Sequence, residues 1–290
     1  MGSSLLISPA GLCSLMQNES IVVIDTRAPN YYCHSHIPGA VNIPELMSYL
    51  ATSDAAGIDD LERFFSNILC KNGVDIEKSI VIYEHKLNEG LGQSSRGLFL
   101  LKYLGCEDVS VLDGGYLAWL KANFNATLRQ DADTLSDERR HMTTKPVSIK
   151  RNLMITKDEM LEALSNPSIV KLDVRDEDEW LGISSSPRGV NPCPRSGRMP
   201  SALWMEWYRT LDDNSGVPIF KPKEEMLREC KQVGITPDTP VYVYCFKGAR
   251  ASHVFVALKE SGIKDVRVYF GSWNEWSRDF DLPVDEVDQF

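Results

Sequence analysis

The sequence contains no uninterrupted apolar run long enough to span a bilayer. The N-terminal stretch MGSSLLISPAGL has neither the basic region nor the long apolar core of a secretory signal. Leu6 occupies the position where a myristoylation motif has Ser or Thr. From these absences we expect a cytoplasmic protein with no membrane role.

The sequence also has fewer positive than negative charges and no regular pattern of paired cysteines. The chain has 31 Lys and Arg residues against 41 Asp and Glu residues, a net charge of −10. Broad nucleic-acid binding needs a basic face, so we expect no nucleic-acid partner, and any anion site must be local. The seven cysteines are odd in number and lack the spacing of a disulfide framework, which is typical of a reducing compartment.

Four sequence landmarks occur twice, in the same order. The pairs are IVVIDTRAPNYY (21–32) with IVKLDVRDEDEW (169–180), HIPGAVNI (36–43) with RMPSALWM (198–205), SIVIYE ending at Glu84 with PVYVYC ending at Cys245, and VLDGGYLAW (111–119) with VYFGSWNEW (268–276). The first pair is offset by 148 positions and the second by 162, so the second copy carries 14 additional residues, within GISSSPRGVNPCPRSG. Four pairs in register indicate a duplicated domain.

Strand-like runs alternate with amphipathic stretches such as KEEMLRECKQVG and ASHVFVALKESG. This alternation predicts an α/β fold with a mostly parallel sheet, and 290 residues suit two domains. The polar segment between the copies is interpreted as a linker. We therefore predict an N-terminal domain at 1–125, a linker at 126–150 and a C-terminal domain at 151–290.

The ordered motifs resemble the rhodanese family: Asp-x-Arg after a strand, a His-Ile-Pro-Gly-Ala turn, a strand ending in Cys before a tight loop, and Gly-Gly-x-x-x-Trp. The resemblance covers nearly the whole chain, twice. It implies two domains, each a small parallel sheet flanked by helices, with the active site near their interface. It also implies a sulfurtransferase whose C-terminal half carries the active cysteine, Cys245.

The residues around Cys245 favour an anion. A thiol at the carboxyl end of a parallel strand lies where α/β folds bind ligands. Inward-pointing loop N–H groups, a helix N-terminus, Lys247 and Arg250 would keep much of Cys245 as thiolate at neutral pH, and Gly248 would let the loop turn inward. The expected substrate-binding set is Phe246, Lys247, Gly248, Ala249, Arg250, Arg188 and Arg195.

A thiolate in such a loop can attack the outer sulfur of thiosulfate, release sulfite and become a persulfide. Cyanide, a small thiol or a thioredoxin-like acceptor would then remove the sulfur. This double displacement needs no cofactor and no metal. The Cys and two His of CHSH (33–36) have no second cluster to complete a metal site, and His36 is expected to cap or pack.

The resemblance also bears on the donor. In mercaptopyruvate-using relatives two arginines nine residues apart hold the substrate carboxylate, and the matching positions here are Glu179 and Arg188. Because only the second is an arginine, and because Lys247 resembles the lysine of thiosulfate-using loops, we expect thiosulfate to be the better donor. Arg195 or Arg198 could replace the missing arginine, and Glu179→Arg is expected to raise mercaptopyruvate use.

Three alternatives stay open at this stage. A cysteine phosphatase is disfavoured because Cys245 to Arg250 spans six residues, one fewer than in the related phosphatases, and the loop contains no carboxylate. The chain could instead be a sulfur relay that is loaded with persulfide only by a partner protein. Cys245 could also be a buried core thiol, and Arg250 an ion-paired residue that orients the helix.

Several residues are expected to support the site without reacting. Asp173 and Arg175 recur as Asp25 and Arg27 in the copy without the cysteine, which indicates a structural pair. Trp276 is expected in the core near the pocket wall, and Phe246 at the loop rim, facing an acceptor. The N-terminal copy has Glu84 at the cysteine position and is interpreted as a scaffold, with Ser94, Ser95 or Arg96 facing the site.

Overall fold

The structure is a computed structural model that describes residues 4–18, 20–47, 52–128, 148–189 and 192–286. The described residues form two compact units. The first draws on 1–49, 60–150 and 212–220, and the second on 50–59, 151–211 and 221–290. The boundaries predicted from the sequence stay a prediction, since most of the expected linker lies outside the described residues.

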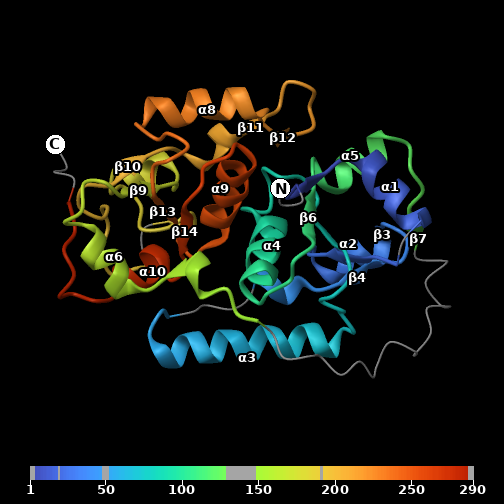
Figure 1. Cartoon of the computed structure of the whole chain (residues 1–290), viewed down its shortest axis with the longest axis horizontal. Helices are drawn as coiled ribbons and strands as arrows, with labels where there is room; N and C mark the ends of the chain where they lie inside the picture. Colours follow the sequence, from blue (N-terminus) through green and yellow to red (C-terminus); the bar gives the residue numbers. More distant parts are fainter. Residues whose placement is uncertain (1–3, 19, 48–51, 129–147, 190–191, 287–290) are drawn as a thin grey trace. The chain divides into compact units, whose positions relative to one another are not determined.

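The first unit is built on a parallel five-stranded sheet in the order β1-β6-β5-β2-β4. Its strands are β1 (Leu6–Ile7), β2 (Val22–Asp25), β4 (Val41–Asn42), β5 (Ile80–Tyr83) and β6 (Val109–Leu112). The β5 and β6 residues are buried throughout, as expected for parallel strands covered on both faces. The helices are α1 (Pro9–Asn18), α2 (Pro29–His34), η1 (Pro44–Met47), α3 (Ala55–Lys71), α4 (Gln93–Tyr103) and α5 (Gly115–Lys121), and β3 (Ser35–His36) pairs antiparallel with β7 (Thr127–Leu128) (Figure 1).

The second unit repeats this plan with a parallel sheet in the order β10-β9-β13-β14-β8. Its strands are β8 (Met154–Ile155), β9 (Val170–Asp173), β10 (Leu203–Trp204), β13 (Val241–Tyr244) and β14 (Val266–Tyr269). Its helices are η4 (Arg151–Leu153), α6 (Lys157–Ala163), α7 (Glu177–Trp180), η5 (Trp207–Thr210), α8 (Lys223–Gln232), α9 (Ala249–Glu260) and α10 (Ser272–Trp276). A separate two-stranded sheet pairs β11 (Leu211–Asp212) with β12 (Ile219–Phe220).

The two sheets have the same topology, which confirms the predicted α/β class and the duplication. Read from one edge, β1-β6-β5-β2-β4 corresponds strand by strand to β8-β14-β13-β9-β10. Asp25 is the last residue of β2 and Asp173 the last residue of β9, while Glu84 follows β5 and Cys245 follows β13. The repeated sequence landmarks therefore occupy equivalent places in the two sheets.

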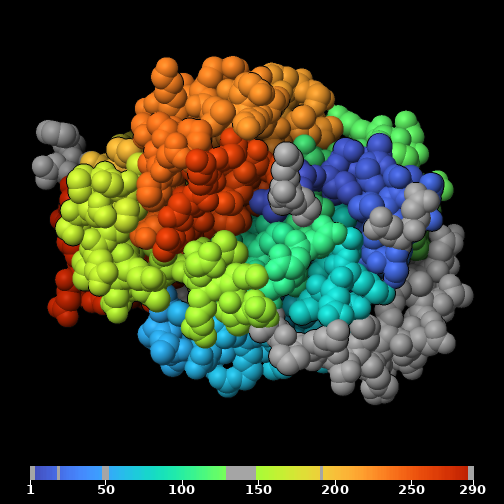
Figure 2. Space-filling view, viewed as in Figure 1, coloured from blue at the N-terminus to red at the C-terminus, as the bar shows by residue number. Residues whose placement is uncertain are grey.

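Helix α8 shows how the amphipathic stretches fold. In KEEMLRECKQ, Met226 and Cys230 are buried four residues apart, on one side of the helix, whereas the charged ends are accessible. Figure 2 shows this helix, in orange, at the surface. Every helix in the described part of the chain is too short or too polar to cross a membrane.

Each unit contains one buried Asp-x-Arg ion pair. Arg27 Nη2 lies 2.6 Å from Asp25 Oδ2, and Arg175 Nη2 lies 2.6 Å from Asp173 Oδ2. The same arginine nitrogens donate to backbone carbonyls, of Ser35 in the first unit and of Gly197 in the second. The first pair therefore ties the end of β2 to β3, and the second ties the end of β9 to Gly197, in agreement with the structural role expected from their repetition.

Glu84 is a buried carboxyl group in the loop that follows β5. Its Oε1 accepts hydrogen bonds from the N–H of Ser94 at 3.1 Å and from its hydroxyl at 2.6 Å. Its Oε2 lies against Gly90, where an added Cβ would come within 2.2 Å. Burial raises the pKa of Glu84 to about 7, and the hydrogen bonds from Ser94 and neighbouring N–H groups oppose this rise.

Glu84 should make the stability of the fold depend on pH. Between its ordinary pKa of 4.5 and about 7, the folded chain holds a proton that the unfolded chain releases. The contribution to the free energy of unfolding therefore falls by about 3 kcal/mol as pH rises through this window. Glu84→Gln mimics the protonated group, so urea titrations should show its advantage over wild type growing from about pH 5 to about pH 7.5.

Wild type must be compared with Glu84→Gln because His253 changes the free energy of unfolding with pH in the opposite direction. Burial lowers the pKa of His253 from 6.5 to about 3, so the fold gains stability as pH rises between these values. Both proteins share this contribution, and it cancels in the difference. A difference that stays constant across the window would contradict the raised pKa of Glu84.

Candidate active site

Cys245 lies in a tight turn between β13 and α9 and is 1% exposed. The β-branched and aromatic residues of VYVY form a fully buried strand, and Gly248 begins the helix with φ of +84°. A Cβ at this glycine would come within 2.7 Å of the Phe270 ring, so both backbone and space require glycine here. The strand, turn and helix thus place the thiol at the carboxyl end of the sheet, as predicted.

The start of α10 holds the cysteine loop in place. The N–H of Trp273 donates to the Cys245 carbonyl and the N–H of Asn274 to the Phe246 carbonyl, both at 3.0 Å. The Cys245 N–H donates to the hydroxyl of Ser272, which in turn donates to the Tyr269 carbonyl. These bonds fix the loop backbone on both sides of the sulfur.

The sulfur receives one hydrogen bond from its own loop. The N–H of Gly248 lies 3.2 Å from Cys245 Sγ. The sulfur faces the first turn of α9, a 12-residue helix whose N-terminus carries partial positive charge. A thiolate or a persulfide at this position would be stabilised by the same donor and dipole.

Arg250 forms ion pairs with two carboxylates. Its Nη1 and Nη2 lie 2.6 Å and 3.0 Å from the two oxygens of Glu179, and Nη1 also lies 3.0 Å from Asp176. Burial lowers the pKa of Arg250, but Glu179, Cys245 and Asp176 raise it further, so the net shift is upward. The side chain is therefore a buried charge beside the sulfur whose donors already have partners, which favours the ion-pair role over direct substrate binding.

This pair corrects the expectation for Glu179. From the sequence, position 179 is expected to be half of a carboxylate clamp from which the arginine is missing. In the structure the Glu179 side chain, on α7, is 1% exposed and forms an ion pair with Arg250. An arginine at 179 would bring a second buried cation against Arg250. The expected gain in mercaptopyruvate use from Glu179→Arg is therefore replaced by an expected loss of stability.

Phe246 and Lys247 follow the cysteine and differ in their surroundings. Phe246 is 6% exposed and packs in the core cluster with Trp273 and Trp276, so the prediction that it faces an acceptor at the rim is wrong. Lys247 is half-buried, and its ammonium lies 4.9 Å from the centre of the Phe246 ring. The phenyl ring therefore positions the lysine charge rather than a substrate.

Arg188 and Arg195 of the inserted segment and the neighbouring Arg198 have different environments. Arg188 is exposed, and its guanidinium makes no hydrogen bond or ion pair with any residue that the structure describes. Arg195 donates to the carbonyls of Trp276, Ser277, Asp279 and Leu282, a structural arrangement that leaves it poorly suited to the substrate contact expected for it. Arg198 stacks at 4.2 Å over the Trp180 ring.

The expected supporting residues pack beneath the loop. The Arg175 guanidinium lies 4.5 Å from the centre of the Trp273 ring, the residue whose N–H holds the Cys245 carbonyl. The Asp173–Arg175 pair is thus coupled to the loop through Trp273. Trp276 is fully buried in the same core and donates to the Pro283 carbonyl.

Cys193 is a second buried thiol near the loop. Its sulfur lies 4.0 Å from Asn274 Oδ1. Burial is the largest influence and raises its pKa, against the effects of Ser277, Arg278, Lys247 and Arg175. The group is therefore held as a neutral thiol, the less nucleophilic form.

The N-terminal copy keeps the loop anchors but not the thiol. The N–H groups of Tyr116 and Leu117 donate to the carbonyls of Glu84 and His85, as Trp273 and Asn274 do in the other copy. Ser94, Ser95 and Arg96 are buried within their own unit, with Ser94 bonded to Glu84. His36 stacks on Tyr32 at 4.0 Å, and no group of three metal-ligating side chains occurs among the described residues.

Sequence reasoning located the loop but missed its fixed partners. Ser272 has a φ of +54°, the equivalent of Gly115 at +63°, and this shared conformation directs the N–H groups of α10 to the loop. The repeated Gly-Gly-Tyr and Gly-Ser-Trp triplets were the available signal. Glu179 was noted only as an absent arginine, because its partner lies 71 residues away.

The chain is similar to proteins with sulfurtransferase names. The thiosulfate sulfurtransferase of Azotobacter vinelandii is 24% identical over 281 residues, which is 97% of this chain and 97% of the relative. The 3-mercaptopyruvate sulfurtransferase of Escherichia coli is 27% identical over 266 residues, covering 91% of this chain and 88% of the relative.

Solved structures agree on the fold. The anaerobic ergothioneine biosynthesis enzyme from Chlorobium limicola, in complex with trimethyl histidine, superposes with a TM-score of 0.79 at 24% identity, covering 97% of this chain and 70% of that one. An EanB complex with ergothioneine gives a TM-score of 0.81 at 23% identity, over 99% of this chain and 71% of that one. The rhodanese-like domain family matches residues 8–122 and 156–279, one match for each copy of the repeat, and the chain therefore belongs to this family.

Proposed function

We propose that the chain is a sulfurtransferase in which Cys245 accepts the outer sulfur of thiosulfate and passes it to a thiophilic acceptor. The observation that carries this proposal is the cysteine loop, with the Gly248 N–H 3.2 Å from the sulfur at the head of α9. The names of the relatives support the sulfurtransferase class. The local charges support an anionic donor.

The first step is an attack by the Cys245 thiolate on the outer sulfur of thiosulfate. A bond forms between the two sulfurs, the sulfur–sulfur bond of thiosulfate breaks, and sulfite leaves with its electron pair. The terminal sulfur of the persulfide carries the negative charge, which the helix dipole and Arg250 stabilise. This step requires no proton donor, because sulfite is a weak base.

The second step regenerates the cysteine. Cyanide or a thiolate, from a small molecule or a thioredoxin-like protein, attacks the terminal sulfur and carries it away. The Cys245 thiolate is the leaving group, and the Gly248 N–H and Arg250 stabilise it as they stabilised the starting state. The same groups thus serve both displacements.

The donor assignment rests on where positive charge is available. The Nη1 and Nη2 donors of Arg250 are already paired with Glu179 and Asp176, whereas Lys247 is half-buried two residues from the sulfur. A compact dianion such as thiosulfate can use this single ammonium group. Mercaptopyruvate needs directed contacts to its carboxylate, for which the exposed Arg188 is the remaining candidate of the expected pair, so it is our second candidate donor.

Replacement of Cys245 is the primary test. Cys245→Ser should abolish sulfite release from thiosulfate while circular dichroism stays unchanged, because an alcohol is not ionised at neutral pH. Intact mass of the wild type after thiosulfate treatment should rise by one sulfur, about 32 Da, and peptide mapping should place it on Cys245.

Single serine variants provide the controls for this test. Replacement of Cys33, Cys70, Cys106, Cys193 or Cys230 should leave substantial activity, since none of them lies in the loop and the three buried thiols, Cys106, Cys193 and Cys230, are neutral. An essential Cys193 would replace the scheme with a two-cysteine relay. Persulfide loading only from a protein partner, without turnover of thiosulfate, would identify a carrier instead of an enzyme.

Lys247→Ala tests the donor. Loss of a charge-assisted contact should lower kcat/KM for thiosulfate about ten-fold or more, and affect mercaptopyruvate less. Lys264→Ala, which removes an exposed lysine paired with Asp238, is the matched control and should change neither value. If wild type already used mercaptopyruvate better than thiosulfate, the donor assignment would be wrong.

Glu179→Arg tests the role of the buried ion pair. It should lower the free energy of unfolding by about 3–5 kcal/mol or more, because Arg250 loses its partner and gains a like charge. Glu177→Arg, at an exposed position of the same helix, should be nearly neutral. A stable Glu179→Arg protein with improved mercaptopyruvate kinetics would restore the clamp hypothesis.

A further inference from the structure

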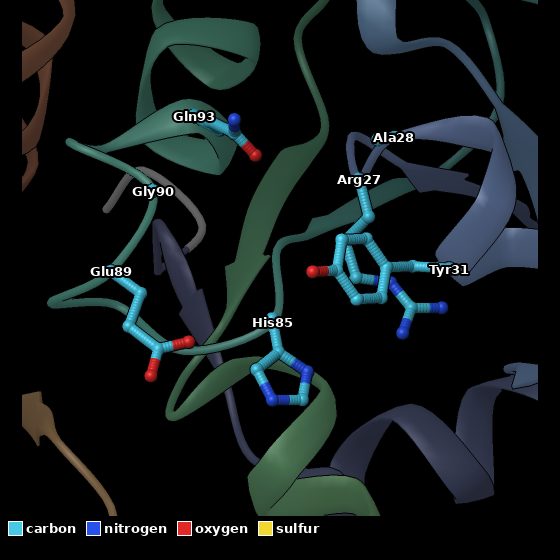
Figure 3. Close-up of a pocket in the computed structure, with 7 residues that line it drawn as sticks. All are labelled: Arg27, Ala28, Tyr31, His85, Glu89, Gly90 and Gln93. Atoms are coloured by element: carbon cyan, nitrogen blue, oxygen red, sulfur yellow. The ribbon is translucent and has the colours of Figure 1, made fainter.

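The first unit contains a cavity beside the loop that replaces the cysteine loop. Its volume is about 390 Å³, within the range of small-molecule sites. The polar residues that line it are Arg27, Tyr31, His85, Glu89 and Gln93, and Gly90 contributes backbone. Figure 3 shows the Tyr31 hydroxyl, the Glu89 carboxylate and the Gln93 amide facing the open centre from different sides.

The cavity exists because the two copies differ at two equivalent positions. Helices α4 and α9 are equivalent, and each begins after a glycine with positive φ, Gly92 and Gly248 respectively. Ser94 and Arg250 each lie two residues after that glycine, so they correspond. The offset of 148 positions makes Tyr31 the counterpart of Glu179. In the second unit a buried ion pair joins Glu179 of α7 to Arg250 of α9, whereas in the first unit neither partner is present.

The cavity is not a second sulfur site. Glu84 already accepts the Ser94 donors at the head of α4, so a carboxylate of the chain itself occupies the position that an anionic sulfur would need. Gly90 separates Glu84 Oε2 from the cavity, since that oxygen lies 2.2 Å from where a Cβ at Gly90 would stand. A ligand must therefore be held by the side chains of the cavity wall.

The wall offers opposite charges on opposite sides. Arg27 uses Nε and Nη2 for Asp25 and the Ser35 carbonyl, and its Nη1 makes no hydrogen bond to another residue of the described chain. Glu89 uses Oε1 for Lys86 at 2.5 Å and is half exposed. In Figure 3 Glu89 lies on one side of the cavity and Arg27 on the other, with the Arg27 guanidinium beside the Tyr31 ring and directed away from Glu89.

The remaining groups are neutral and polar. Partial burial is the largest influence on His85 and lowers its pKa, so the ring is neutral at pH 7 and can both donate and accept. The Tyr31 hydroxyl and the Gln93 amide have the same double capacity. The lining therefore suits a ligand that carries both a cation and an anion.

We propose that this cavity binds a small zwitterion of the class of free amino acids and short peptides. The carboxylate of the ligand faces Arg27, and its ammonium group faces Glu89. The Tyr31 hydroxyl, His85 and Gln93 hydrogen-bond to the polar atoms between them. This binding is independent of the reaction at Cys245.

Unsubstituted glycine peptides are suitable probes because they contain no thiol that could react with Cys245. Glycine, glycylglycine and triglycine would be titrated into the full chain, and the ring signals of its histidines followed by NMR. The His85 signal is identified by its loss in His85→Gln. At least one of the three zwitterions should shift it saturably, whereas the signal of the buried His253 should not move.

Blocked versions of the best probe test the charge assignment. The N-acetylated peptide lacks the ammonium group and the peptide amide lacks the carboxylate, and each should bind about ten-fold more weakly or worse. Equal binding of the blocked and unblocked probes would overturn the proposal. So would the absence of a saturable His85 shift with all three zwitterions.

Glu89→Gln tests the wall itself. It should weaken the zwitterion about ten-fold while leaving binding of the N-acetylated probe unchanged, because only the ammonium contact is lost. Glu77→Gln, another exposed carboxylate of the same unit outside the cavity, is the matched control. Equal weakening by both variants would show a general charge effect and contradict the site.

Discussion

The capture of a loop by the first N–H groups of a helix is the constraint on which both halves of this protein depend. In each unit the loop after the central strand offers two consecutive carbonyls, and the helix after the next strand donates to both. The donors are available because the first residues of a helix have no partner of their own. A residue with positive φ, Gly115 or Ser272, turns the chain so that these groups meet the loop. The side chain that follows the strand is thereby held at the head of the next helix.

What occupies that position decides the chemistry of each unit. The Glu84 carboxyl group accepts a hydrogen bond from Ser94 and packs against Gly90. Because it is buried, its charged form is destabilised and it retains a proton up to about pH 7. A thiol at Cys245 makes a single hydrogen bond with Gly248 and has Arg250 nearby. The first arrangement bonds a carboxyl group of the chain to its own loop, whereas the second holds a thiol that receives one hydrogen bond from its loop. One scaffold therefore holds a carboxyl group in one copy and, in the other, the thiol that we propose as the nucleophile.

The sequence was informative wherever function depends on residues close together in the chain. The strand, cysteine, glycine and helix of residues 241–260 lie within one local pattern, and the repeated landmarks placed that pattern in an α/β fold. It was uninformative where partners are distant. The pairing of Glu179 with Arg250, the burial of Phe246 and the four carbonyls around Arg195 all depend on how remote segments pack. The cavity beside Tyr31 arises from the loss of such a distant pair, so no local pattern marks it.

The placement of charge around Cys245 links stability to donor choice. A buried arginine needs a carboxylate partner, since an unpaired guanidinium in this position would be strongly destabilising. Glu179 and Asp176 satisfy that need, and by doing so they weaken the attraction of Arg250 for a second anion. The donor proposal is based on the charge of Lys247, which lies over the Phe246 ring and is partly accessible. A point charge of this kind attracts a compact dianion without fixing its orientation, whereas a planar carboxylate is best recognised by a bidentate guanidinium. The same ion pair that holds the cysteine loop together is therefore part of the reason why we propose thiosulfate as the donor.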